Sequence, residues 1–269
     1  MSVSKAVRLW ATFMTETICT ITKLSDLESI TSPGEAGNTV FFRGEPCSYY
    51  TLIPKIGRIT TPPPPPEPNK IRLCLKFESE VVDEFKILDR FKRSALPFLS
   101  VLPKNDWEWL ALAQHHGLPT RLLDWTSNPL IALYFAVGNR FTENELAIER
   151  VRNPNYNGDA VLYKIKTRHG LMETAYGNPF KVEEGLFASP VVTRRIQAQS
   201  GVFSIQDDPF KSYKELFLKY SKRHFFRFVI PFESREPIRQ QLCLYGIDHF
   251  HVFPDLDGLT RKLQDELNV

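Results

Sequence analysis

The segment from Gln114 to Asn128 holds the densest group of side chains that could do chemistry in this sequence. Two histidines, His115 and His116, precede a Gly/Pro turn, and Arg121 and Asp124 follow it. Histidine titrates near neutral pH, so these two rings could act as a general base or as stacking partners. The alternative is a structural network in which Arg121 pairs with Asp124, because buried charges need partners.

Two helices are expected to hold this segment in place. Asn105 is a candidate N-cap for a helix through Trp107, Leu110 and Ala113, which Gly117 and Pro119 would end. The residues 121–123 read as a short extended segment. Asn128 and Pro129 then open a second helix, which is apolar on most sides and is therefore expected to be buried.

The chain before this segment shows three further signals. A short helix is expected over Leu24–Ile30, with Ser25 as its N-cap and Glu28 completing a capping box. Thr39–Arg43 is β-branched and aromatic and predicts a strand, with Gly44 at its end. Pro62–Pro66 predicts an exposed polyproline spacer, and Lys70–Arg93 has the apolar spacing of a long amphipathic helix.

The remaining chain mixes strands and helices without regular alternation. The expected strands are 160–165, 191–196, 202–205, 225–230 and 250–253, and the expected helices are 213–222, 233–244 and 256–267. No glycine-rich turn follows a strand. The sequence therefore predicts an α+β fold with a mixed, mainly antiparallel split sheet flanked by helices. Residues 1–38 are expected to form a lead-in, and residues 39–269 a single globular unit with a proline-rich loop at 60–69.

Composition argues against several classes of protein, among them highly basic nucleic-acid binders and membrane proteins. The net charge is only +3, from 34 basic and 31 acidic residues, which gives no general argument for nucleic-acid binding. The four cysteines form no CxxC pair, and no run of 18 apolar residues is present. No apolar run and small-residue cleavage site follow the basic start, so no secretory signal is expected. We therefore expect a cytoplasmic protein that does not enter a membrane. His249 and His251 would share one face of a strand, but no third metal ligand is evident, so no metal is expected.

Several of these motifs resemble the FRG domain family. The opening motif is Phe42-Arg43-Gly44, and the main signature is Gln114–Pro129 followed by Ala132–Ala136. Arg195–Phe203 and Phe253–Leu259 are similar to later motifs of that family, so the resemblance covers about Thr39 to Leu263. It implies a toxin or phage-defence setting and a possible antitoxin partner.

A weaker resemblance is to ADP-ribosyltransferases of the Arg–Ser–Glu type. Arg43 matches the arginine that anchors the NAD phosphate or ribose, and Thr126 lies near the serine position. Gln199 stands where those enzymes carry the catalytic glutamate. An amide can hydrogen-bond a ribose hydroxyl but brings no negative charge. Either another carboxylate, with Asp124 the obvious candidate, substitutes for it, or the site binds without turnover.

These resemblances imply two alternative functions. The first is an ADP-ribosyltransferase-like enzyme that binds NAD as a substrate and modifies a protein or nucleic-acid acceptor. The second is a non-catalytic module that recognises a nucleotide or nucleic acid. The catalytic candidates are Gln199, Asp124 and His116. The candidates for binding NAD are Arg43, Arg121, Arg195, His115, Gln114 and Thr126. Three guanidinium groups from separate motifs predict one shared pocket for an anionic ligand.

Overall fold

The computed structural model describes residues 18–31, 39–59, 83–138, 141–174, 177–189, 193–219 and 223–267. This part of the chain is mixed α+β, as predicted, and contains a seven-stranded sheet of order β1-β7-β4-β2-β3-β6-β5. β1 is parallel to β7, and every other neighbouring pair is antiparallel. The strands are β1 (Ile18–Thr20), β2 (Thr39–Glu45), β3 (Leu123–Thr126), β4 (Ala160–Thr167), β5 (Glu184–Phe187), β6 (Gly201–Gln206) and β7 (Arg223–Ile230).

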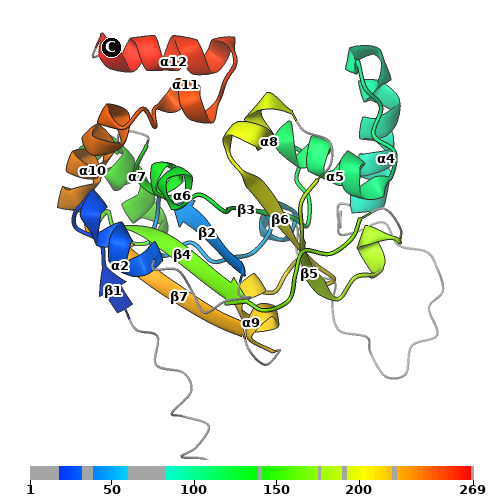
Figure 1. Cartoon of the computed structure of the whole chain (residues 1–269), viewed down its shortest axis with the longest axis horizontal. Helices are drawn as coiled ribbons and strands as arrows, with labels where there is room; N and C mark the ends of the chain where they lie inside the picture. Colours follow the sequence, from blue (N-terminus) through cyan, green and yellow to red (C-terminus); the bar gives the residue numbers. More distant parts are fainter. Residues whose placement is uncertain are drawn as a thin grey trace, which may run out of the picture.

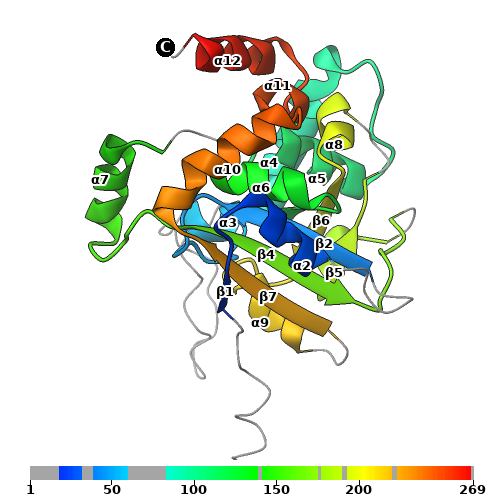
Figure 2. The ribbon, with the colours of Figure 1, turned by 60° about the vertical axis from the view of Figure 1, so that its left-hand side comes forward.

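Helices cover the two halves of this sheet separately (Figure 1). The α-helices are α2 (Leu27–Thr31), α3 (Lys55–Ile59), α4 (Glu84–Ala95), α5 (Asp106–His115), α6 (Pro129–Val137), α7 (Glu143–Arg152), α8 (Arg194–Ala198), α9 (Tyr213–Leu218), α10 (Phe232–Leu244), α11 (His249–Val252) and α12 (Leu256–Glu266). Short 3₁₀ turns occupy Leu24–Asp26, Leu96–Phe98 and Pro179–Lys181. Helices α6 and α10 share a core with β2, β4 and β7, whereas α5 shares one with β5 and β6. A third cluster joins α9 to β2, β3 and β4, with α9 on the side of the sheet away from α6 (Figure 2).

The helices that bracket the main signature form where local signals predict them. The Asn105 side chain accepts a hydrogen bond from the Glu108 backbone N–H and caps α5. The Asn128 side chain accepts one from the Leu130 N–H and caps α6, which has Pro129 in its first turn. Most of α6 is buried, as its apolar composition predicts. The expected strands at 39–43, 160–165, 202–205 and 225–230 are also present, as β2, β4, β6 and β7.

Two predicted strands are wrong. The described part of the stretch 191–196 contains the start of the helix α8, because the Thr193 side chain accepts a hydrogen bond from the Ile196 N–H and caps it. The stretch 250–253 lies mostly in α11, where Asp248 caps the helix by accepting from the His251 N–H. Both stretches are β-branched or aromatic, and in both a capping side chain overrides that preference. His249 and His251 therefore do not share a strand face.

Other element boundaries differ from the prediction. The turn at Leu24 is organised by Asp26, whose carboxylate accepts from the Thr22 and Lys23 backbone N–H groups, rather than by Ser25 and Glu28. Of the predicted extended segment 121–123, only Leu123 lies in a strand, as the first residue of β3. Helix α4 starts at Glu84 under an Asp83 cap. The first part of the predicted Lys70–Arg93 helix and the run Pro62–Pro66 lie outside the described residues. The helices α3 and α7 and the strands β1 and β5 were not predicted.

The two halves of the sheet meet at a single residue pair. β2 pairs with β4 along its whole length, from Thr39 to Glu45, and β3 pairs with β6 along its whole length. Between β2 and β3, however, the register contains only Phe42 opposite Thr126. Beyond that pair the strands part, so the residues that follow Phe42 in β2 lie across a gap from those that precede Thr126 in β3.

No helix in the described ranges combines the length and the apolar character needed to cross a membrane.

Candidate functional site

A cavity of about 350 Å³ opens where β2 and β3 part. We call it the junction cavity. It is lined by Phe42, Arg43, Gly44, Glu45, Pro46, Gln114, His115, Asp124, Trp125, Thr126, Phe135, Arg195, Ile196, Gln199, Gly201, Val202 and Phe203. These residues come from both halves of the sheet and from the three helices α5, α6 and α8. The cavity therefore exists because the sheet is joined at only one pair.

Arg43 bridges the two strands where the ladder is missing. Its Nη1 donates to the backbone carbonyl of Asp124 at 2.6 Å, and its Nε and Nη2 reach Oε1 of Glu45 at 2.8 and 2.6 Å. The Asp124 carboxylate lies 3.9 Å from Nη1. Burial by itself would lower the pKa of Arg43, but the charges of Glu45 and Asp124 raise it on balance. Arg43 thus stays cationic at the floor of the cavity and is already partly neutralised.

Glu45 is a site residue that the sequence analysis missed. It is 8% exposed and lines the junction cavity. Side chains alternate across a strand, so a prediction that Arg43 faces a ligand also places Glu45, two residues on, on the same face. That alternation was the available signal.

Asp124 lies at the mouth of the cavity, since its side chain is 57% exposed. Its Oδ2 accepts a hydrogen bond from Nε2 of Gln114 at 3.0 Å. The Gln114 Oε1 in turn accepts from the Thr120 hydroxyl at 2.6 Å. This chain of hydrogen bonds fixes Asp124 to the end of α5 in contact with water.

Gln199 and Thr126 hold the opposite wall together. The Thr126 hydroxyl donates to the Gln199 backbone carbonyl at 2.7 Å, so it secures the chain rather than pointing a free donor into the cavity. The Gln199 Nε2 donates to the Val252 carbonyl at 3.2 Å, and no hydrogen bond within the described residues engages its Oε1. Ser200, next in the chain, has a φ of 47°, a left-handed conformation that is uncommon for residues other than glycine.

Arg195 is the cation of the cavity that has no anionic partner among the described residues. Its Cζ lies 4.1 Å from the centroid of the Phe253 ring, a cation–π contact. Among the described residues it has no hydrogen bond or ion pair through its side chain. Burial lowers the pKa of Arg195, and the more distant charges of Asp255 and Asp124 oppose this. A guanidinium held on one face by an aromatic ring keeps its N–H groups available for an anionic ligand.

The segment 38–145 matches the family model of the FRG domain. The chain contains an FRG domain. The match is shorter than the stretch of motifs recognised in the sequence, and it includes β2, α5, β3 and α6. Arg195 and Gln199 lie beyond it, so the junction cavity is completed by chain outside the matched segment. Comparison with curated proteins and with solved structures returned no match.

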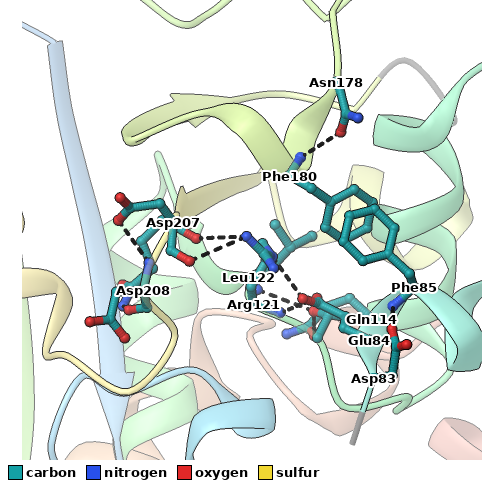
Figure 3. Close-up of polar contacts among 12 residues, drawn as sticks. Asp83, Glu84, Phe85, Gln114, Arg121, Leu122, Asn178, Phe180, Asp207 and Asp208 are labelled. Carbon is teal, nitrogen blue, oxygen red and sulfur yellow. Dashed lines mark hydrogen bonds and ion pairs between the residues drawn. The ribbon is translucent and has the colours of Figure 1, made fainter. Parts of the chain in front are cut away.

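Arg121 does not line the junction cavity. Its Nε lies 2.7 Å from Oε2 of Glu84, and its backbone N–H donates to Oε1 of the same carboxylate at 2.8 Å (Figure 3). Its Nη1 reaches the carbonyls of Gln206 and Asp207, and its Cζ lies 4.8 Å from the Phe180 ring centroid. Arg121 therefore serves a structural ion pair, as the alternative interpretation held, but its partner is Glu84 and not Asp124. Two of the three predicted arginines meet at the cavity, and the third is buried in a separate ion pair.

His116 also lies outside the junction cavity. It lines a more open cleft of about 860 Å³ that shares Gln114, His115 and Arg195 with the cavity. Asp255 and Asp257 lie on the other wall of this cleft. Within the described residues, no group of three or more histidine, cysteine or acidic side chains could hold a metal ion. The His249 ring nitrogen Nδ1 is instead 2.7 Å from the Tyr134 hydroxyl.

His115 is expected to stay neutral in the folded FRG domain at physiological pH. Burial, then the charges of Arg195 and His116, lower its pKa from 6.5 to about 4. Between about pH 4 and pH 6.5, His115 therefore binds a proton in the unfolded chain but not in the folded chain. The free energy of unfolding should therefore fall as the pH drops from about 6.5 towards 4.

The variant His115→Gln should lose this part of the pH dependence. We expect its melting temperature to change less between pH 7 and pH 5 than that of the parent. Thermal unfolding at both pH values, followed by circular dichroism, measures the difference. An equal change in parent and variant would show that His115 titrates normally.

Proposed function

We propose that the junction cavity binds NAD and that this protein is an ADP-ribosyltransferase-like enzyme that transfers ADP-ribose to a protein or nucleic acid. The observation that carries the proposal is the convergence, at one break in the sheet, of groups from four separate stretches of chain. These groups are Arg43, Gln114, His115, Asp124, Thr126, Arg195 and Gln199. Two guanidinium groups together with amide and carboxylate side chains suit a ligand that carries both phosphates and ribose hydroxyls.

Each group has a role that follows from its present partners. Arg195, without an anionic partner among the described residues, suits the pyrophosphate. Arg43 can hold a ribose or phosphate oxygen from the floor of the cavity, and Oε1 of Gln199 can accept a ribose hydroxyl. The order of these residues along the chain, arginine on β2, Thr126 on β3 and Gln199 just before β6, supports the resemblance to ADP-ribosyltransferases.

The alternative is a non-catalytic module that recognises a nucleotide or nucleic acid. The neutral amide of Gln199 favours it, because an amide cannot match a carboxylate in stabilising a developing positive charge. Both functions fit a toxin or phage-defence effector held by an antitoxin partner. Incubation with labelled NAD and protein, RNA and DNA acceptors separates them. Nicotinamide release or label transfer that falls in Asp124→Ala or Gln199→Ala supports the enzyme, and intact NAD binding without release or transfer supports the module.

Arg195→Gln is expected to weaken NAD binding by about 10- to 100-fold, the size expected for losing a charge-assisted hydrogen bond. The fold should be little affected, since Arg195 contributes no ion pair among the described residues. Isothermal titration calorimetry with NAD measures the affinity, and thermal unfolding checks the fold.

Arg194→Gln is the matched control for this experiment. Arg194 is the neighbouring residue on α8, is exposed and does not line the cavity. Both variants remove one positive charge from the same helix, so long-range electrostatics changes alike. Equal NAD affinity in the two variants would remove Arg195 from the site, and no measurable NAD binding by the parent would overturn the proposal.

A further inference from the structure

The junction cavity contains a buried carboxylate that is only half engaged. Both guanidinium contacts of Arg43 go to Oε1 of Glu45, at 2.8 Å from Nε and 2.6 Å from Nη2. Within the described residues, no hydrogen bond engages the other oxygen, Oε2. The Glu45 side chain is 10% exposed. Glu45 lines the junction cavity, and a carboxylate oxygen that has no hydrogen bond within the described residues can accept one from a ligand bound there.

Asp124, the other carboxylate of the cavity, is less well placed to stabilise positive charge on a ligand. The Asp124 side chain is 57% exposed, and its Oδ2 already accepts a hydrogen bond from Gln114. The Coulomb interaction of two charges is about four times weaker in bulk water than near a protein surface with an effective dielectric constant of about 20. Pairing with Arg43 offsets part of the Glu45 charge. At a similar distance from a ligand, the remaining charge acts through a less polarisable medium than that of Asp124 and is screened less.

We propose that Glu45 is the carboxylate that faces the reacting ribose, an inference that rests on the function proposed above. The bond between C1′ of the ribose and the nicotinamide nitrogen breaks, and the electron pair leaves with neutral nicotinamide. Positive charge that develops at C1′ and the ring oxygen is stabilised by Oε2. The hydroxyl or other nucleophile of the acceptor, or water in hydrolysis, bonds to C1′ and gives its proton to Oε2, which later releases it to solvent.

Arg43 has a positioning role in this arrangement. It binds Oε1 through two nitrogens and the Asp124 carbonyl through a third, so the Glu45 side chain is fixed in one orientation across the gap between β2 and β3. The negative charge that Gln199 lacks is supplied from the opposite strand of the same cavity.

Glu45→Gln tests the proposal, because it keeps the shape of the side chain and removes its charge. Nicotinamide release from NAD, with water as the acceptor, should fall about 100-fold or more. The dissociation constant for NAD should stay the same or decrease severalfold, since a negative charge near the phosphates is removed and Arg43 loses its neutralising partner. A purely structural role would weaken binding as well. Asp124→Asn, the control at the other carboxylate, should slow release less than Glu45→Gln does.

A rescue variant gives a second readout. Adding Gln199→Glu to Glu45→Gln returns a carboxylate to the opposite wall of the cavity and should restore part of the lost rate. If Glu45→Gln folds poorly, Glu45→Asp keeps a charge near Arg43 but withdraws it from the ribose, and its rate should still fall at least tenfold.

The outcomes separate this inference from the proposed function. Parent-like nicotinamide release in a folded Glu45→Gln or Glu45→Asp protein that binds NAD would overturn the role of Glu45 and leave the proposed enzyme intact. A parent protein that binds no NAD, or binds it and releases no nicotinamide, would overturn both the enzyme and the role of Glu45.

Discussion

Glu84→Ala is expected to lower the free energy of unfolding by about 3–5 kcal/mol, because it leaves the Arg121 charge buried without its partner. Arg121 is 9% exposed and Glu84 7% exposed, so water cannot replace the lost carboxylate. The same carboxylate also accepts the Arg121 backbone N–H, which loses its acceptor in the variant. A domain of ordinary stability, about 5–15 kcal/mol, would retain little margin. Urea denaturation followed by tryptophan fluorescence measures the change.

Two controls test the physical reason. Asp89→Ala removes a carboxylate from the same helix, but its pair with Arg93 is exposed on both sides, and the expected cost is below about 1 kcal/mol. Glu84→Met combined with Arg121→Met removes both charges and should be more stable than Glu84→Ala alone. NAD affinity of a folded double variant should equal that of the parent, since Arg121 lies outside the junction cavity. Equal destabilisation by Glu84→Ala and Asp89→Ala would show that Arg121 is not truly desolvated.

Arg121 also illustrates which parts of the site the sequence can predict. Local signals predicted α5 and α6, because the asparagine caps of both helices and the proline in the first turn of α6 act within a few residues. Local signals do not predict the ion-pair partner of Arg121. Asp124 is three residues away and was the partner in the structural alternative, whereas Glu84 is 37 residues away and is the observed one. Only the packing of α4 against α5 decides between them, and no local pattern contains that information.

The remaining errors have similar physical causes. The stretches at 191–196 and 250–253 contain the residue types that favour strands, but capping side chains and tertiary contacts place α8 and α11 there. The gap between β2 and β3 depends on the register of strands far apart in sequence, so the cavity could not be located before the fold was known. Glu45, in contrast, could have been predicted from strand alternation, because Arg43 had already been placed in the site.

Gly44→Ala is expected to cost about 3 kcal/mol or more, at or beyond the upper end of the range for overpacked cores. A Cβ on Gly44 would lie 1.8 Å from the Ala132 carbonyl oxygen and 2.6 Å from the Ala136 nitrogen. Both atoms belong to the backbone of α6, so no side-chain rotation relieves the contact. Helix α6 is buried between the sheet and α10 and cannot move away without opening that core. Thermal and urea unfolding measure the loss.

Gly201→Ala is the matched control, since Gly201 also lines the junction cavity. Its added Cβ would meet Ile196 at 3.5 Å, an ordinary contact, so we expect a change within about 1 kcal/mol. Gly44 thus has a structural role, because it allows β2 to pack closely against α6. The close approach that it permits sets α6, and with it Phe135, against the same cavity that Arg43 and Glu45 line from β2. If Gly44→Ala proved as stable as Gly201→Ala, α6 would have to lie farther from β2, and the shape of the cavity would change with it.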